Sequence, residues 1–192
     1  MALSIGPSHA DHPRLDPVAP RLAPVFCFAL LTVSCALASL ALACATPFAA
    51  FAVVAAAMLP LRKALLVIAG AWLVNQGVGF GALHYPVDGS TIASGVVIGA
   101  AALLSTAAAS AVLRKLPQGR ALMFAVTLIA AYATYEIALL SATPFLGGEG
   151  AFTAAVVARI GLTSAAWLAG LVAACEIVRL VDRFGRRSAM SA

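Results

Sequence analysis

A few polar side chains lie within stretches of sequence that are otherwise apolar. Trp72, Asn75 and Gln76 occupy positions i, i+3 and i+4 of one such stretch, a spacing that puts them on one face of a helix. Tyr135 and Glu136 lie together in a later stretch. Because polar groups are costly to bury in apolar surroundings, they often line binding sites or ion paths. These residues are therefore the first candidates for function.

Three further side chains extend this set. Arg159 lies inside the last apolar stretch, and His84 and Tyr85 directly follow the stretch that contains Asn75. Aromatic rings, amides and one guanidinium are suited to binding a small molecule by ring stacking and directed hydrogen bonds. The candidate substrate-binding residues are Trp72, Asn75, Gln76, His84, Tyr85, Tyr135, Glu136 and Arg159.

Each of these residues also has a purely structural interpretation. Glu136 and Arg159 are expected to pair and so to hold their two helices together, whether or not they line a site. Asn75 and Gln76 can serve as hydrogen-bonding contacts between helices. His84, near the end of its stretch, can be an ordinary solvated histidine instead of a metal ligand.

The sequence contains none of the common motifs that carry catalysis. It has no Ser/His/Asp spacing, no paired carboxylates within the apolar stretches, no zinc-protease motif and no phosphate-binding P-loop. The four cysteines lie in apolar runs, without a CxxC pair or a Cys/His pair at zinc spacing. We therefore expect neither an enzyme nor an ATPase, and no cofactor.

The composition is that of an integral membrane protein. Of 192 residues, 63% are hydrophobic and 10% are charged, against roughly 45–50% and 25% in soluble domains. One small soluble core cannot bury so many apolar side chains, so lipid must be the solvent for most of them. The net charge of +5 does not indicate nucleic-acid binding, because the basic residues flank apolar stretches and form no continuous face.

Six apolar stretches are predicted to be transmembrane helices, which makes the fold an all-α bundle. Most of them have the roughly 20 residues that cross about 30 Å of hydrocarbon. The second stretch is short and crosses only if Thr46, Leu61 and Arg62 extend its ends. The predicted spans are Val25–Ala45, Pro47–Pro60, Ala64–Leu83, Thr91–Leu113, Ala121–Ala142 and Ala151–Val178.

The basic residues predict the orientation of this bundle. Arg14 and Arg21 precede the first span, and other lysines and arginines follow the second, fourth and sixth spans. The intervening loops, near Thr46 and at 84–90 and 143–150, contain no lysine or arginine. Because cytoplasmic loops are rich in these residues, both ends of the chain are predicted to be cytoplasmic, with the protein in the inner (plasma) membrane.

The chain divides into one transmembrane domain and two tails. Residues 1–24 contain five prolines and are predicted to be a flexible cytoplasmic tail. Residues 25–180 form the six-helix domain, and 181–192 are a basic cytoplasmic tail.

The candidate residues share a depth in the membrane. From the helical rise, Asn75 lies about 12 Å from the outer end of its span, Glu136 about 8 Å and Arg159 about 12 Å. His84 and Tyr85 belong to the adjoining outer loop. The sequence therefore predicts a polar, aromatic pocket that opens to the exterior.

A six-helix bundle with this orientation and an outward pocket resembles the substrate-binding S components of energy-coupling-factor vitamin transporters. The resemblance covers residues 25–180. It implies partners, a transmembrane coupling subunit and ATPases, with the coupling subunit docking on small residues of the first helix. In this sequence Cys35, Ser39 and Ala43 form such a stripe of small residues.

Within that family, Asn75–Pro86 (NQGVGFGALHYP) looks most like the cobalamin-specific members. In those proteins a soft ligand near the outer end of the third span reaches the cobalt of the corrin. Cysteine is the ligand expected there, and this sequence has His84 in its place. The resemblance implies that His84 is the ligand to the cobalt of a bound corrinoid.

Three functions remain open at this stage. The first is an uptake protein that binds a small molecule from the outer face, with a vitamin, cobalamin among them, as the expected substrate. The second is an accessory or assembly subunit of a larger membrane complex, in which the polar residues only hold helices together. The third is a membrane redox protein or enzyme that uses His84.

Overall fold

The computed structural model describes residues 15–42, 45–116, 120–147 and 149–190. Within them the chain is all-helical, as predicted, and contains no strand. The elements are α1 (Ala23–Leu42), α2 (Phe48–Met58), α3 (Leu61–Gly77), the π-helix η1 (Val78–Ala82), α4 (Gly89–Lys115), α5 (Arg120–Leu146), the 3₁₀ turn η2 (Glu149–Phe152) and α6 (Ala154–Met190).

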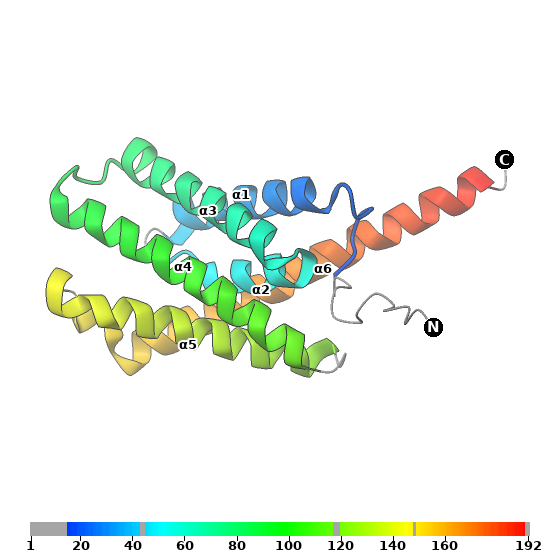
Figure 1. The fold of residues 1–192 in the computed structure, drawn as a ribbon. Coiled ribbons are helices and arrows are strands. Elements are labelled where there is room, and N and C mark those ends of the chain that lie inside the picture. The colour runs from blue at the N-terminus through cyan, green and yellow to red at the C-terminus, as the bar shows by residue number, and fades with distance from the viewer. Residues whose placement is uncertain (1–14, 43–44, 117–119, 148, 191–192) are drawn as a thin grey trace, which may run out of the picture.

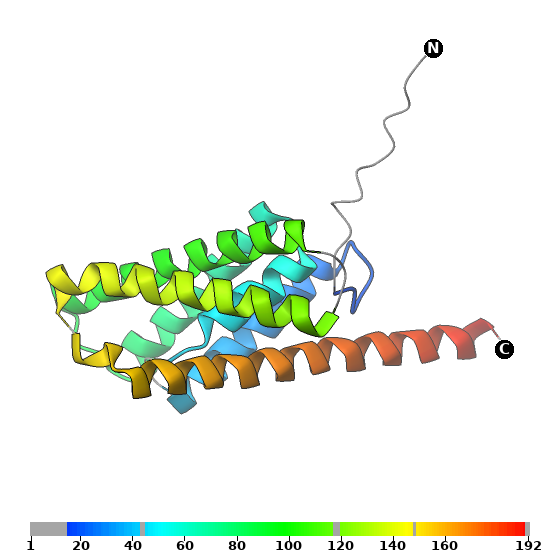
Figure 2. The same cartoon turned by 90° about the horizontal axis from the view of Figure 1, so that it is seen from below.

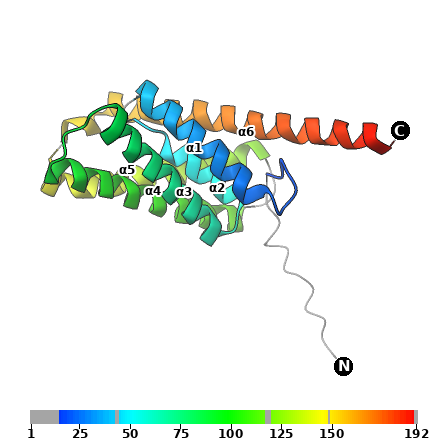
Figure 3. The same cartoon turned by 90° about the horizontal axis from the view of Figure 1, so that it is seen from above.

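The six α-helices run back and forth along one bundle (Figures 1 and 2). The start of α1 and the end of α6 lie at the same end of it, and the view from above agrees (Figure 3). In the described residues, all of these helices except α2 are long and apolar enough to cross a membrane. The protein is therefore an all-α, multi-pass membrane protein.

The second helix differs from the other five. α2, expected to be short, has 11 residues and rises only about 16 Å. Thr46, Leu61 and Arg62 do not extend it, because the helix begins at Phe48 and α3 begins at Leu61. α2 lies in the middle of the bundle and contacts α1, α3, α4, α5 and α6. Phe48, Phe51 and Met58 are buried, as are seven others of its 11 residues. A helix that is apolar on every side is stable only when other helices surround it, which accounts for its place.

The outer faces of the surrounding helices are apolar. Leu66 on α3 is 73% exposed, Leu122 on α5 75% and Leu162 on α6 73%. Large hydrophobic side chains exposed over a whole bundle need a solvent as apolar as themselves, so these faces contact lipid.

The ends of the transmembrane domain differ from the predicted boundaries. Leu15, expected in a flexible tail, is 4% exposed, and its N–H donates to the carbonyl of Ala57 at 3.2 Å. Leu15 and the buried Pro17 therefore pack against the end of the bundle near α2. Residues 1–14 of the predicted tail lie outside the described residues. α6 continues without a break past residue 180, through most of the predicted basic tail.

The distribution of basic residues matches the alternation of the helices. Arg21 precedes α1, Arg62 lies at the start of α3, Arg114 and Lys115 close α4, and Arg183 lies in the last part of α6. The alternation of the helices puts all of these positions at the end of the bundle where α1 starts (Figure 1). The positive-inside rule predicts that this end is cytoplasmic. The opposite end, where α1 and α3 end and α4 begins, is called the outer end below.

Candidate functional site

The outer half of α3 joins α1 and the α1–α2 connection through a chain of hydrogen bonds. The Ser39 hydroxyl donates to the carbonyl of Cys35 at 2.7 Å. Asn75 Nδ2 donates to Ser39 Oγ at 2.8 Å and to Thr46 Oγ1 at 3.0 Å. Buried polar groups between membrane helices need such partners, because lipid offers none. The structural interpretation of Asn75 is therefore confirmed.

Gln76 ends this chain. Its Nε2 donates to Asn75 Oδ1 at 3.0 Å. Among the described residues, nothing pairs with the Gln76 Oε1 acceptor or with the second Nε2 hydrogen. The Gln76 amide lies against the backbone of α4 at Gly95, in the space that a side chain at that position would take.

A cavity of about 110 Å³ lies beside this amide. It is bounded by the α1–α2 connection, the outer end of α3, η1 and the first turns of α4, at the end of the bundle far from the start of α1 (Figure 1). Its polar lining comes from Thr46, Asn75, Gln76, Tyr85, Thr91 and Ser94. Its apolar lining comes from Phe48, Phe80 and Ile98, with Gly79 and Gly95 contributing backbone.

The end of α3 is shaped to bring Tyr85 over this cavity. The glycine-rich stretch after Gly77 winds as a π-helix, a geometry often found at functional sites. His84 then adopts a left-handed backbone with φ 55°, which is uncommon for a residue other than glycine. The chain turns back here, and the N–H of Tyr85 donates to the carbonyl of Gly79 at 3.0 Å. A Cβ at Gly79 would lie 2.9 Å from the Tyr85 ring.

The first turn of α4 closes the other side of the cavity. Asp88 caps the helix, and its Oδ1 accepts the backbone N–H of Thr91 at 2.8 Å and the Ser90 hydroxyl at 2.7 Å. These hydrogen bonds, the one from Thr91 above all, lower the pKa of the Asp88 carboxyl. The cap fixes the turn that carries Thr91 and Ser94 into the lining.

Trp72 and Tyr135 do not line the cavity; both make packing contacts between helices. The Trp72 indole N–H donates to the carbonyl of Gly95 at 2.8 Å, and a Cβ at Gly99 would lie 2.7 Å from the indole. The buried Tyr135 ring packs on Phe48, with centroids 6.4 Å apart. Trp72 and Gln76 lie on the same face of α3, against α4, as predicted. Trp72, however, packs between the two helices and does not contact the cavity.

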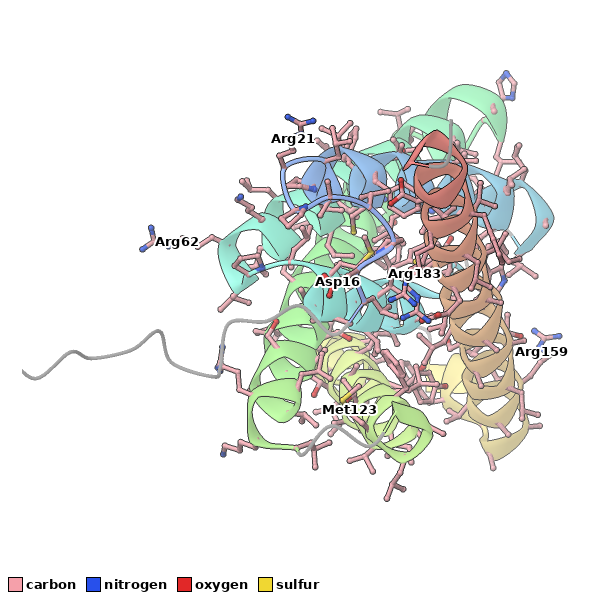
Figure 4. The ribbon with its side chains drawn as sticks, turned by 90° about the vertical axis from the view of Figure 1, so that its right-hand side faces the viewer. Asp16, Arg21, Arg62, Met123, Arg159 and Arg183 are labelled. Carbon is pink, nitrogen blue, oxygen red and sulfur yellow. The ribbon has the colours of Figure 1, made fainter. Side chains whose placement is uncertain are left out.

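Glu136 and Arg159 do not pair, so the predicted ion pair is wrong. Glu136 is half-buried and lies beside Tyr132, whose hydroxyl donates to the carbonyl of Val157 on α6 at 2.7 Å. Arg159 is exposed and points away from the bundle (Figure 4). The contact between α5 and α6 is thus made by the backbone of α6 at Val157. Arg159 lies on the face of α6 that points away from the bundle (Figure 4).

His84 also lies away from the cavity. Its side chain is exposed, and it is not part of the lining. The described residues contain no group of three His, Cys, Asp or Glu side chains that could hold a metal ion. Of the candidate residues, Asn75, Gln76 and Tyr85 line the cavity, whereas His84, Glu136 and Arg159 are not part of its lining.

The stripe of small residues on α1 packs against another helix of the same chain. Cys35 and Ser39 are buried against α3, where Cys35 Sγ donates to the carbonyl of Ala71 at 3.2 Å. Ala43 lies outside the described residues. These two positions are therefore not available to the coupling subunit that the resemblance implies.

Three polar residues of the lining, Thr46, Thr91 and Ser94, were not among the residues predicted from the sequence. A signal for the latter two was present: an Asp88 N-cap places Thr91, Ser94 and Ile98 on one helical face, at i, i+3 and i+7. Thr46 had no such signal, because its approach to Asn75 depends on how α1 and α3 pack.

The chain matches no protein-family model, no curated protein and no solved structure.

Proposed function

We propose that this protein is a membrane uptake protein, or the substrate-binding subunit of one, that takes a small uncharged solute into the cavity between α3 and α4 from the outer face. The observation that carries the proposal is the Gln76 amide, which lines the cavity. No described residue uses its Oε1 acceptor or its second Nε2 hydrogen. Polar groups in a membrane bundle are costly unless paired, so an amide whose acceptor and second hydrogen are unused at the edge of a cavity favours a ligand.

The size of the cavity argues for a small solute. A volume of about 110 Å³ is well below the roughly 300–1,000 Å³ of pockets for drug-sized ligands. A corrinoid is far larger, and His84, the residue expected to bind its cobalt, lies outside the cavity. The cobalamin substrate and the cobalt ligand are therefore not part of this proposal.

The test is to fill the cavity. Ser94→Leu adds an isobutyl group to the lining, while Val96→Leu makes a change of similar kind at a position that is 55% exposed on the same helix. Saturation-transfer NMR on the purified protein measures binding of small uncharged solutes such as acetamide and acetone. We expect a signal in the wild type and in Val96→Leu, and its loss in Ser94→Leu. No signal from any solute in the wild type would overturn the proposal.

A second candidate function, the accessory subunit, is favoured by α6. This helix contacts mainly α2, it extends past the rest of the bundle (Figure 2), and it exposes Leu162, Ile177, Val181 and Phe184. A partner helix would cover such a face as well as lipid does. If the wild type binds no solute and the chain is isolated in mild detergent only within a larger complex, this function becomes the better one.

A further inference from the structure

The hydrogen-bond chain beside the cavity has a fixed direction. The Ser39 hydrogen goes to the carbonyl of Cys35, so the Ser39 oxygen is an acceptor for Asn75. Both Nδ2 hydrogens of Asn75 are then used by Ser39 and Thr46. Its Oδ1 must therefore face Gln76, which orients the Gln76 amide with Nε2 toward Asn75.

This direction leaves a defined set of groups for a ligand. Gln76 Oε1 needs a donor, and its second Nε2 hydrogen needs an acceptor. Gln76 lines the cavity, and its Oε1 is not sealed off, since the buried atoms without a partner in the described residues are elsewhere, at Ser110 and Arg179. A carboxamide or a urea carries a donor and an acceptor side by side, and so complements an amide.

The lining carries no charge. None of the described residues that bound the cavity is ionic, and the nearest acidic group in sequence, Asp88, already accepts hydrogen bonds from Ser90 and Thr91. Bringing an ion into such a site would cost desolvation without a counter-charge to offset it. The ligand must therefore be neutral.

The volume limits the size of the ligand. An apolar cavity of about 150 Å³ is known to hold benzene, whereas this one has about 110 Å³. The rings of Phe48 and Phe80 and the side chain of Ile98 leave an apolar wall for one or two methyl groups.

We infer that the cavity selects a neutral primary carboxamide or a urea smaller than benzene, whose N–H donates to Gln76 Oε1 and whose carbonyl accepts from Gln76 Nε2. This inference rests on the proposed function and names the substrate class of the same site.

Four probes of one shape test the inference. Acetamide has both a donor and an acceptor, and acetone has only the acceptor. Acetate is the matching anion and acetamidinium the matching cation. Their binding to the purified protein is measured by saturation-transfer NMR, because so small a ligand binds weakly, with Kd on the order of 1 mM. We expect acetamide to bind about tenfold more tightly than acetone, the factor for one added hydrogen bond, and neither ion to bind detectably.

A variant assigns the preference to Gln76. Gln76→Met keeps the length of the side chain and removes both amide groups, so the acetamide-to-acetone ratio should fall from about ten to about one. Leu73→Met, at a lipid-facing position of the same helix that is 60% exposed, should leave the ratio unchanged. The wild-type ratio itself needs no variant and remains informative if Gln76→Met fails to fold.

The outcomes separate this inference from the proposed function. Equal binding of acetamide and acetone in the wild type, both blocked by Ser94→Leu, would overturn the carboxamide preference and leave the solute-binding function standing. A preference that persists in a folded Gln76→Met protein would likewise overturn the role of Gln76. Binding of no probe would overturn both.

Discussion

The polar side chains of α3 and those of α5 occupy the same outer half of the bundle, but they are arranged for different tasks. Around α3, Asn75 and Gln76 extend a directed hydrogen-bond chain to the edge of a cavity. On α5, Tyr132 donates directly to the backbone of α6, and its ring lies 3.3 Å from where a Cβ of Gly161 would be. One group therefore leaves an amide for a ligand, while the other closes a contact between two helices.

The difference arises from where the glycines lie. Gly95 and Gly99 let Trp72 and Gln76 approach the backbone of α4, and Gln76, Gly95 and Tyr85 all line the cavity beside this contact. The ring of Tyr132 packs against Gly161, and none of the described residues that line the cavity belongs to α5 or α6. Residues of the same kinds at the same depth can thus bind a solute or hold helices together, depending on backbone approach.

Filling the contact between α3 and α4 should have the largest effect. Gly99→Leu would force a side chain into the Trp72 indole, which is held by its hydrogen bond to Gly95. We expect the free energy of unfolding to fall by about 3 kcal/mol, measured by unfolding in a mixed detergent. Gly170→Leu is the matched control, because no atom lies within 4 Å of a Cβ there. Equal stability of the two variants would contradict the close approach of α3 and α4.

Removing the centre of the hydrogen-bond chain should have an intermediate effect. Asn75→Leu loses the donors to Ser39 and Thr46 and the acceptor for Gln76. We expect a loss of about 1.5 kcal/mol in the free energy of unfolding, together with weaker acetamide binding, because Gln76 is no longer oriented. Thr32→Val is the control, since the Thr32 hydroxyl bonds only to carbonyls of its own helix. A fully stable Asn75→Leu protein would mean that the chain does not join α1 to α3.

Weakening the contact between α5 and α6 should lower the stability less than the two changes above. Tyr132→Phe removes the hydrogen bond to Val157 and should cost about 0.6 kcal/mol, the average for such bonds between membrane helices. Acetamide binding should not change.

Arg159→Met should alter the free energy of unfolding by less than about 0.5 kcal/mol, because the side chain is exposed. Coupling between Glu136→Gln and Arg159→Met in a double-mutant cycle would contradict the absence of an ion pair.

The smallest effect concerns the cap of α4. The pKa of the Asp88 carboxyl lies below its ordinary value of 3.8, chiefly because the carboxyl accepts the backbone N–H of Thr91. The ionised group therefore contributes its stability at neutral pH, and this contribution is lost as the pH falls from 3.8 through the lowered pKa. Asp88→Asn can still cap the helix, so its thermal stability should change less over that range. An identical acid dependence in both proteins would show that the cap does not titrate.

The sequence by itself was sufficient for the fold class and for the end of α3 that borders the cavity. Apolar stretches of membrane length and loops without basic residues depend on local composition, so the five long helices and their alternation were predicted correctly. The face that carries Asn75 and Gln76 follows from helical periodicity alone. The short Phe48–Met58 stretch was the exception, because its own residues do not say whether lipid or other helices surround it.

The tertiary structure alone decided which polar residues meet. Glu136 and Arg159 share a depth, but the rotation of α6 about its axis turns Arg159 away from α5 (Figure 4). His84 precedes Tyr85 by one residue, yet its left-handed backbone leaves its own ring outside while Tyr85 returns over Gly79. Thr46 reaches Asn75 only because α1 and α3 pack side by side. Periodicity fixes the face of a residue on its own helix, whereas helix rotation and close approach depend on packing against all the other helices at once.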